Sequence, residues 1–312
     1  GFSPARVLAG GQLIGRPQLA VAGNGRALIA WIELTHGGTR RIVRIAERPP
    51  GGSFGAPATL SGRGRADVLT AAANARGDQV VAFVRDGEVL ARVRRPGRGW
   101  GSIQRLARAT SGTQWQLAAA IDDRGQVRVV WRRHQLRRES APGRTALESA
   151  AVLVGRNTFT AAQTLTADGA SATFRIARIP NGWAVADVET TTEGPRPALH
   201  RTHGGSQFSP VEYAAPAQGG TRAADVAFSP AAGITVAWVV PLPGQDSDGV
   251  ARAASLIGDA FGPVQDVSPP EAVHEVRLAG DVAVWTARPE GTGPSIPIGQ
   301  IRTVVRSAQR TP

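Results

Sequence analysis

Three residue types are missing from the sequence, which contains no cysteine, no methionine and no lysine. Without cysteine the chain has no disulfide bonds, no thiolate metal site and no cysteine nucleophile. Long apolar runs are missing too, since none approaches the roughly 18 residues that a membrane-spanning helix requires. The longest candidate, residues 234–240, is interrupted by Thr235 and followed by Pro241. We therefore expect no membrane span, and a core held together by packing alone.

The missing lysine leaves arginine as the source of all 36 basic charges, against 24 acidic residues. The formal net charge is +12 and the isoelectric point is near 11.6. One interpretation is attraction to a polyanion, because a guanidinium group stays charged and binds carboxylate or phosphate through two hydrogen bonds. The other is the codon usage of a GC-rich genome, and the sequence leaves both open. Aromatic residues are sparse among the arginines, so we do not expect nucleic acid as the partner.

A short phrase recurs along the chain: a turn glycine is followed by an apolar run that ends on an aromatic residue. A weaker copy, residues 182–188, has lost that aromatic and gained Trp183 and Asp187. Six copies in 312 residues correspond to about 52 residues per unit, a period typical of propellers and other repeat folds. The five complete copies are residues 25–31, 77–83, 125–131, 233–238 and 280–285.

A second phrase places an aromatic residue, such as Phe54, before the last strand of each unit. Its sixth copy stands at the N-terminus, residues 1–9, and the last unit lacks one. In the first unit, turns separate four strands near residues 17–22, 27–32, 41–46 and 54–60. These patterns predict an all-β fold: a six-bladed β-propeller of four-stranded antiparallel blades, whose ring is closed by the N-terminal strand completing the last blade.

We expect a single domain over residues 1–312, because closed β folds run long as one domain. The third unit contains an insertion, residues 132–147, which we interpret as a basic loop or a short helix. The predicted blades span residues 15–62, 63–107, 108–166, 167–214, 215–268, and 269–312 together with 1–14.

The unit resembles the repeat of secreted bacterial six-bladed propellers, many of them actinobacterial, which are loosely similar to sialidase-like propellers. The resemblance rests on Gly-Gly-x-Phe-Gly-x-Pro-x-x-Leu-Ser at residues 51–61 and on the apolar-aromatic strands. It implies a secreted or cell-surface protein, and the start at Gly1, without a charged and then apolar leader, is what we expect of a mature or trimmed chain. Of the family's Asp boxes only residues 123–125 keep Asp-x-Gly. The one tyrosine, Tyr213, aligns with an outermost strand, so we do not expect sialidase chemistry.

Propeller sites lie at one end of the central channel, where each blade's first strand begins. Several arginines with few acids are predicted there, and such a group would hold a carboxylate, sulfate or phosphate. Trp115 would either stack on a ligand or fill a gap between blades. Asp67 and Glu275 would serve a glycosidase only with carboxyl groups about 5 to 10 Å apart, which blades two and six do not favour. The candidate ligand-binding residues are Arg16, Arg63, Arg65, Asp67, Trp115, Arg175, Arg222, His274 and Glu275.

No metal or other cofactor is expected, and no catalytic residue is identified. His200 and His203 are three apart, so on a strand they point to opposite faces and do not share an ion. We favour an extracellular, non-enzymatic propeller that binds an anionic polymer, such as an acidic glycan or a cell-wall polymer, or a protein partner. The alternative is a carbohydrate-active enzyme, a glycoside hydrolase or polysaccharide lyase, which requires a carboxylate with a shifted pKa at the channel mouth. A structural subunit of a surface assembly is a third hypothesis, and the sequence does not predict the oligomeric state.

Overall fold

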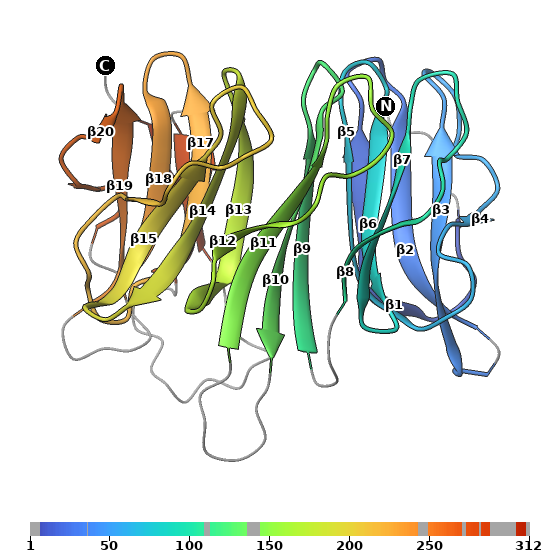
Figure 1. Ribbon diagram of the computed structural model, residues 1–312, viewed down its shortest axis with the longest axis horizontal. Coiled ribbons are helices and arrows are strands. Elements are labelled where there is room, and N and C mark those ends of the chain that lie inside the picture. Colours follow the sequence, from blue (N-terminus) through green and yellow to red (C-terminus); the bar gives the residue numbers. More distant parts are fainter. Residues whose placement is uncertain are drawn as a thin grey trace. The chain divides into compact units, whose positions relative to one another are not determined.

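The computed structural model describes residues 7–35, 37–108, 113–135, 144–242, 249–269, 273–280, 282–287 and 304–309. The strands of these residues form six separate antiparallel sheets (Figure 1). Within this described part of the chain, no helix is long and apolar enough to cross a membrane. The chain divides into two compact units, Gly1–Thr164 and Leu165–Pro312, which are described separately.

The first three sheets each have four strands in sequence order, so every connection joins neighbouring strands. Sheet 1 consists of β1 (Leu13–Val21), β2 (Ala27–Thr35), β3 (Arg40–Arg48) and β4 (Ala58–Thr59). Sheet 2 consists of β5 (Ala66–Ala73), β6 (Gln79–Arg85), β7 (Glu88–Arg94) and β8 (Gln104–Arg108). Sheet 3 consists of β9 (Thr113–Ile121), β10 (Val127–Gln135), β11 (Arg144–Val152) and β12 (Gln163–Thr166).

The other three sheets repeat this order. Sheet 4 consists of β13 (Ala170–Ile179), β14 (Gly182–Thr191), β15 (Gly194–Arg201) and β16 (Glu212–Tyr213). Sheet 5 consists of β17 (Arg222–Ser229), β18 (Gly233–Pro241), β19 (Gly249–Ile257), and two short strands that both pair with β19, β20 (Ala260–Phe261) and β21 (Gln265–Asp266). Sheet 6 consists of β22 (Val273–Ala279), β23 (Val282–Ala287) and β24 (Val304–Gln309).

The second strand of sheet 2 is apolar on both faces because a neighbouring sheet covers each face. Side chains alternate along a strand, so Val80 and Ala82 face one way and Val81 and Phe83 the other. Val80 and Ala82 belong to a buried cluster with sheet 3, which includes Trp131. Val81 and Phe83 belong to a separate cluster with sheet 1. A continuous apolar run is therefore what this strand requires, and strict alternation would leave one of its two interfaces polar.

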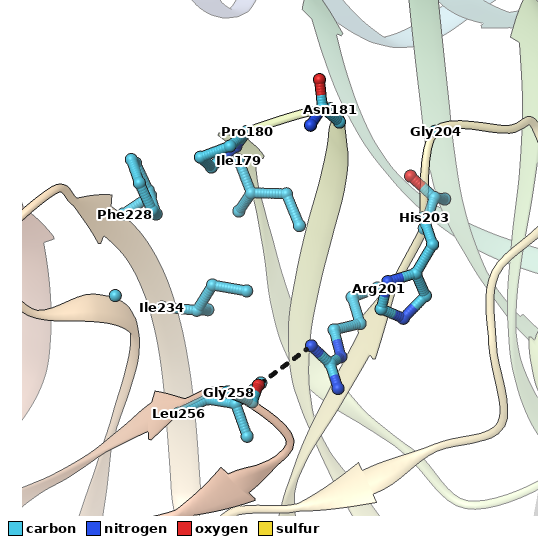
Figure 2. Close-up of a pocket in the computed structure, with 12 residues that line it drawn as sticks. Ile179, Pro180, Asn181, Arg201, His203, Gly204, Phe228, Ile234, Leu256 and Gly258 are labelled. Carbon is cyan, nitrogen blue, oxygen red and sulfur yellow. Dashed lines mark hydrogen bonds between the residues drawn. The ribbon is translucent and has the colours of Figure 1, made fainter.

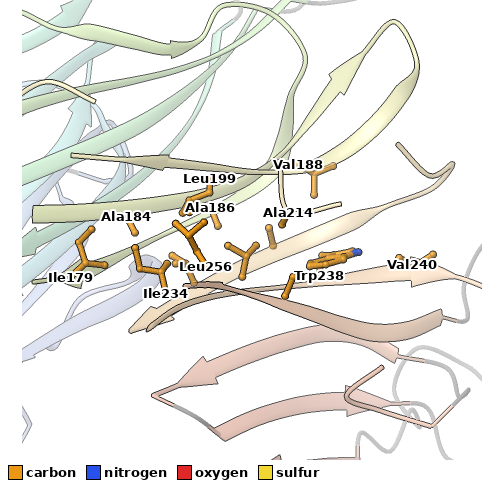
Figure 3. Close-up of a cluster of buried hydrophobic side chains, with 14 residues drawn as sticks. Ile179, Ala184, Ala186, Val188, Leu199, Ala214, Ile234, Trp238, Val240 and Leu256 are labelled. Carbon is orange, nitrogen blue, oxygen red and sulfur yellow. The ribbon is translucent and has the colours of Figure 1, made fainter. Parts of the chain in front are cut away.

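The second unit is held together by the same kind of packing. Figure 3 shows the cluster between sheets 4 and 5, in which Ala184, Ala186 and Leu199 meet Ile234 and Trp238. A further cluster joins sheets 5 and 6 and contains Trp285. The recurring aromatics are thus core residues, and each is at most 4% exposed: Trp31, Phe83, Trp131, Trp238 and Trp285.

Sheet 4 departs from this pattern at the aromatic position. In sheets 1, 2, 3 and 5 the aromatic stands five residues after the residue that closes the first hairpin, as Phe83 does after Asp78. In sheet 4 the hairpin closes at Gly182, opposite Ile179, and the fifth residue after it is Asp187. A carboxylate therefore takes the place of a buried ring, and it is fully buried.

Two expectations about the strands are corrected by the structure. The fourth strand predicted for residues 54–60 forms only at Ala58–Thr59. Phe54 lies before it, in irregular backbone. Both ends of the predicted insertion at residues 132–147 are strand, since β10 continues to Gln135 and β11 begins at Arg144. Residues 136–143 lie outside the described part of the chain.

The predicted closing strand cannot be followed, because residues 1–6 also lie outside the described part. Sheet 6 consists of three strands in the residues that the structure describes, and the closing strand stays a prediction. The described strands of each sheet fall within the predicted blade boundaries, apart from the beginning of β1 at Leu13 and the end of β8 at Arg108.

Candidate functional site

The predicted ligand-binding residues stand where the first strand of each sheet is irregular. Five of the six first strands shift register near their beginning, as strands do at a β-bulge. A bulge adds a residue to one strand and redirects the side chains around it, and bulges are frequent beside active sites. The shifts fall between Ile14 and Gln18, Ala66 and Val68, Ala170 and Phe174, Arg222 and Asp225, and Val273 and Glu275.

Seven of the nine predicted residues lie in or beside these shifts. Arg16 and Asp67 are inside the shifts of β1 and β5, and Arg65 precedes that of β5. In the second unit, Arg175 follows the shift of β13, Arg222 begins that of β17, and His274 and Glu275 stand at that of β22. Sequence reasoning located these residues through the connections between units, but it did not predict the bulges.

The second unit brings Glu275 and two arginines together. Arg175 forms an ion pair with Glu275, with 3.6 Å between Nη2 and Oε1, and Arg277 donates to the same oxygen. The backbone carbonyls of Phe174 and Val276 accept a further hydrogen bond from these two guanidinium groups. Both arginines and Glu275 keep more than a third of their side-chain surface exposed. The group therefore presents fixed guanidinium edges to solvent.

Asp225 lies beside this group and joins two first strands. Its Oδ1 accepts the backbone N–H of Val226 at 2.8 Å, and its Oδ2 accepts that of Leu278, on β22, at 2.9 Å. Burial raises the pKa of this carboxyl, and Glu275 raises it further, against the two backbone hydrogen bonds and Arg175, which lower it. Sequence reasoning missed Asp225, because it lies inside β17 and matches neither recurring phrase.

The backbone beside Asp225 is strained. Ala223 lies in the register shift of β17 with a φ of 50°, a left-handed conformation that residues with a Cβ rarely adopt. Strained backbone costs on the order of 1–3 kcal/mol and collects at functional sites. Arg222, next to it, donates from Nη2 to the carbonyl of Val273 at 3.4 Å, which ties this bulge to the beginning of β22.

The first unit has a corresponding group at the beginning of β5. Asp67 accepts from Arg41, and its Oδ1 lies 4.0 Å from Nε of Arg65. The backbone N–H of Arg65 donates to Oδ1 of Asp86 at 2.8 Å. Arg63 and Arg16 are exposed. Arginine thus exceeds acid here as it does in the second unit.

Trp115 differs from the other predicted residues, because the structure places it in the core. It lies on β9, which pairs with β10 without a shift in register. Its side chain is 8% exposed and packs in the cluster of sheets 2 and 3. A regular strand directs this ring inward, so Trp115 fills the gap between sheets, and little of its surface remains for a ligand.

Sheet 4 carries a second polar group, which is buried. Nε2 of His200 lies 3.3 Å from Oδ1 of Asp187 and 3.4 Å from Oγ1 of Thr166, and each of these residues is at most 1% exposed. The other carboxylate oxygen, Oδ2 of Asp187, is buried without a hydrogen-bond partner. His200 is buried on β15, whereas His203 lies in the bend after β15 and is exposed, so the strand period predicted for this pair does not extend to His203.

The single tyrosine is held in its protonated form. Tyr213 lies on β16, the outermost strand of sheet 4, and its hydroxyl donates to Oε2 of Glu189 at 2.7 Å. Burial and this hydrogen bond raise the pKa of Tyr213 to about 12, and the guanidinium of Arg196 stands 3.9 Å from the ring centre. Such a tyrosine is a poor nucleophile.

No protein-family model matches the chain, and no curated protein matches it in sequence. Solved structures resemble it at low identity. An ulvan lyase, a polysaccharide lyase, is 11% identical with a TM-score of 0.52, over 88% of this chain and 76% of the lyase. The acylaminoacyl peptidase of Pyrococcus horikoshii is 10% identical with a TM-score of 0.50, over 90% of this chain and 43% of the peptidase.

A puromycin hydrolase is 15% identical with a TM-score of 0.47, and the match covers 95% of this chain and 52% of the hydrolase. The chain thus spans about half the length of the puromycin hydrolase structures that it matches. At these identities the likeness concerns the fold alone. Together with the six antiparallel sheets, it shows that the chain has the β-propeller fold.

Proposed function

We propose that the protein is an extracellular, non-enzymatic propeller that binds an anionic polysaccharide at the irregular beginnings of its first strands. One observation carries the proposal: register shifts recur at the same point of the sheets, and arginines stand in or beside them in both units. Regular strands would serve a scaffold equally well, so the recurrence of the shifts points to a role for the side chains that they redirect.

The chemistry of the second unit suits carboxylate or sulfate groups. Arg175, Arg222 and Arg277 outnumber Asp225 and Glu275, and both oxygens of Asp225 accept backbone N–H groups. Glu275 pairs with the guanidinium groups of Arg175 and Arg277, and its side chain is half-exposed. A ligand carboxylate could add to this group or displace Glu275, because exposed ion pairs contribute only about 0–1 kcal/mol.

The proposal is tested with polygalacturonate, an available polyuronate, at fixed ionic strength. In Arg175→Gln/Arg277→Gln the two guanidinium edges are removed, and we expect the dissociation constant to rise about 10-fold, which corresponds to about 1.4 kcal/mol. The matched control is Arg98→Gln/Arg124→Gln, which removes the same charge at exposed positions outside the group. Equal weakening in both double variants would show diffuse attraction to the whole surface and would contradict the proposed site.

Asp225 favours a second candidate function, a glycoside hydrolase or polysaccharide lyase. A buried carboxyl with a raised pKa next to a second carboxyl, Glu275, is an arrangement that general acids use. The experiment is an assay for new reducing or unsaturated ends released from acidic and neutral glycans, with Asp225→Asn as the comparison. Release that Asp225→Asn abolishes would establish catalysis. Release from no glycan, or equal release by the variant, would reject an enzyme that depends on this carboxyl.

A further inference from the structure

A cleft of about 580 Å³ opens between sheets 4 and 5, at the end where their first hairpins turn. This end is opposite to the one that carries the arginine groups, because each first strand runs from its irregular beginning to its hairpin. Figure 2 shows Ile179 and Pro180 from the hairpin of sheet 4 beside Phe228 and Ile234 of sheet 5. The volume lies within the range of about 300–1,000 Å³ that small-molecule sites occupy.

The two walls of the cleft differ in chemistry. One wall is apolar and consists of Ile179, Phe228, Ile234 and Leu256. The other presents the guanidinium of Arg201 and the imidazole of His203, and Figure 2 shows both side chains on the same side of the space. None of the residues that the structure describes as lining the cleft is acidic. The cleft thus combines an apolar surface with an edge that carries a guanidinium and an imidazole.

Arg201 is held in place by groups around it. Its Nε donates to Glu212 at 2.5 Å, its Nη2 to Asp259 at 2.9 Å, and its Nη1 to the carbonyl of Gly258 at 3.5 Å. The side chain of Asp259 is 93% exposed, so water competes for it. An anionic ligand group could therefore replace Asp259 without any change in the position of Arg201.

The corresponding space between sheets 2 and 3 is filled, which shows what sheet 4 lacks. There, Nδ2 of Asn74 donates to Oδ2 of Asp78 and to the carbonyl of Asp122. Arg95 donates to Oδ1 of Asp78 at 3.1 Å and also to the carbonyls of Gly125 and Arg156, on sheet 3. Three side chains thus close the end of this interface with hydrogen bonds.

Sheet 4 has different residues at all three positions. Asn74 and Asp78 face each other where the first hairpin closes, and Ile179 and Gly182 do so in sheet 4. Arg95 directly follows Arg94, which pairs with Gln79. In the same way, His203 directly follows Thr202, whose N–H donates to the carbonyl of Trp183. The polar filling is replaced by an apolar side chain, a glycine and a shorter imidazole side chain, and the cleft is the result.

We propose that this cleft binds a small anionic amphiphile, a molecule with an aromatic or branched apolar body and one carboxylate or sulfonate. The apolar body lies against Phe228, Ile234 and Leu256. The anionic group lies at Arg201 and His203, where it takes the place of the exposed carboxylate of Asp259. This site does not depend on the polysaccharide site proposed above.

The test uses the full chain and two probes of similar shape, anilinonaphthalene sulfonate and the uncharged phenylnaphthylamine, in fluorescence titrations. We expect saturable binding at one site, with the sulfonate about 10-fold tighter than the uncharged probe. His203→Arg restores the residue type found in sheet 2 and takes up space in the cleft, so it should weaken the uncharged probe at least about 10-fold, whereas the added guanidinium offsets part of this loss for the sulfonate. Leu153→Arg adds the same side chain after β11, on sheet 3, and should leave both affinities unchanged.

Three results would overturn the proposal. They are binding of the uncharged probe that His203→Arg leaves unchanged, binding that Leu153→Arg weakens equally, and equal affinity for the charged and uncharged probes. Near-ultraviolet circular dichroism of each variant shows that it is folded. If His203→Arg does not fold, Ile234→Ala provides the second test, because the removal of an apolar contact should weaken both probes alike.

Discussion

Asp187 is the residue at which the repeat is broken most sharply. In the described sheets an aromatic ring fills this buried position in the apolar second strand, and here a carboxylate takes its place beside His200. A buried ion pair or polar pair is often no more stabilising than apolar residues of similar volume, but the loss of one partner is costly. Asp187 and His200 must therefore be kept or replaced together, which none of the aromatic positions requires.

Replacement of His200 by alanine should destabilise the protein strongly. Asp187 would stay buried without its imidazole partner, and we expect a loss of about 3 kcal/mol in the free energy of unfolding, measured by urea titration. His203→Ala is the matched control, since His203 is exposed, and it should change stability by less than about 0.5 kcal/mol. The double change Asp187→Leu/His200→Leu should recover most of the loss. A small effect of His200→Ala would mean that Asp187 does not depend on its imidazole partner.

Asp225 should make the stability depend on pH in a defined direction. Because burial raises the pKa of this carboxyl above its ordinary value of 3.8, its protonated form favours the folded state. The contribution is present below the pKa of the unfolded chain and is lost as the pH rises through the folded pKa. The stability of the wild type relative to Asp225→Asn should thus fall as the pH rises above about 4, by at most about 1.4 kcal/mol per pH unit. Urea titrations between pH 3.5 and 6.5 measure this difference, and an increase with pH would refute the assignment.

At the scale of the strand, the register shifts separate what the sequence predicts from what it does not. The second strands were predictable, because two-sided burial requires an apolar run and its turn glycine and aromatic mark both ends. The shifts leave no such mark. Arg222 and Asp225 look like ordinary strand residues, and the extra residue between them is seen only in the pairing with β18.

The outer strands show the opposite limit. The phrase around Phe54 marks the last segment of sheets 1 to 5, and its sixth copy stays a prediction. In sheet 1, pairing depends on how the chain meets β3, and only Ala58 and Thr59 meet it in register. Trp115 was predictable as an aromatic outside both phrases. Whether it faced a ligand or the core depended on the regularity of β9, which no residue of the sequence shows.

The bulge of β17 gives a prediction at this scale. Ala223→Gly should stabilise the protein by about 1 kcal/mol, because glycine adopts a φ of 50° without the Cβ clash. Ala224→Gly, at the neighbouring buried position, should destabilise it by about 1 kcal/mol or more. Thermal unfolding of the two variants under one set of conditions distinguishes these effects. Destabilisation by both would show that the backbone at Ala223 is not strained.

At the scale of the whole molecule, the positive charge consists of guanidinium groups alone. The ordinary pKa of a guanidinium lies far above neutrality. Among the described residues, burial lowers the pKa of Arg128 to about 10, and this side chain is buried. The field around the protein should therefore persist under alkaline conditions in which a lysine-rich protein would lose much of its charge.

Retention on immobilised polygalacturonate should accordingly be constant between about pH 7 and pH 10. The ordinary pKa values of carboxyl and imidazole groups lie below this range, and that of the guanidinium lies above it. Arg175→Lys/Arg277→Lys should weaken retention toward pH 10, because lysine begins to lose its proton near that pH. The salt concentration at elution is the measured quantity. If the wild type also loses retention over this range, the arginines are not the groups that bind.

The buried aromatic positions have a spectroscopic consequence. Every sheet, or a loop joined to it, carries a tryptophan: Trp31, Trp100, Trp131, Trp183, Trp238 and Trp285, with Trp115 as a second one in sheet 3. Most of these indoles are shielded from water, so each should emit at short wavelength while its own sheet is intact. Replacement of all but one of these tryptophans by phenylalanine would give a set of single-tryptophan proteins. In each of them the emission wavelength would report the unfolding of one sheet, so the order in which the sheets unfold could be determined.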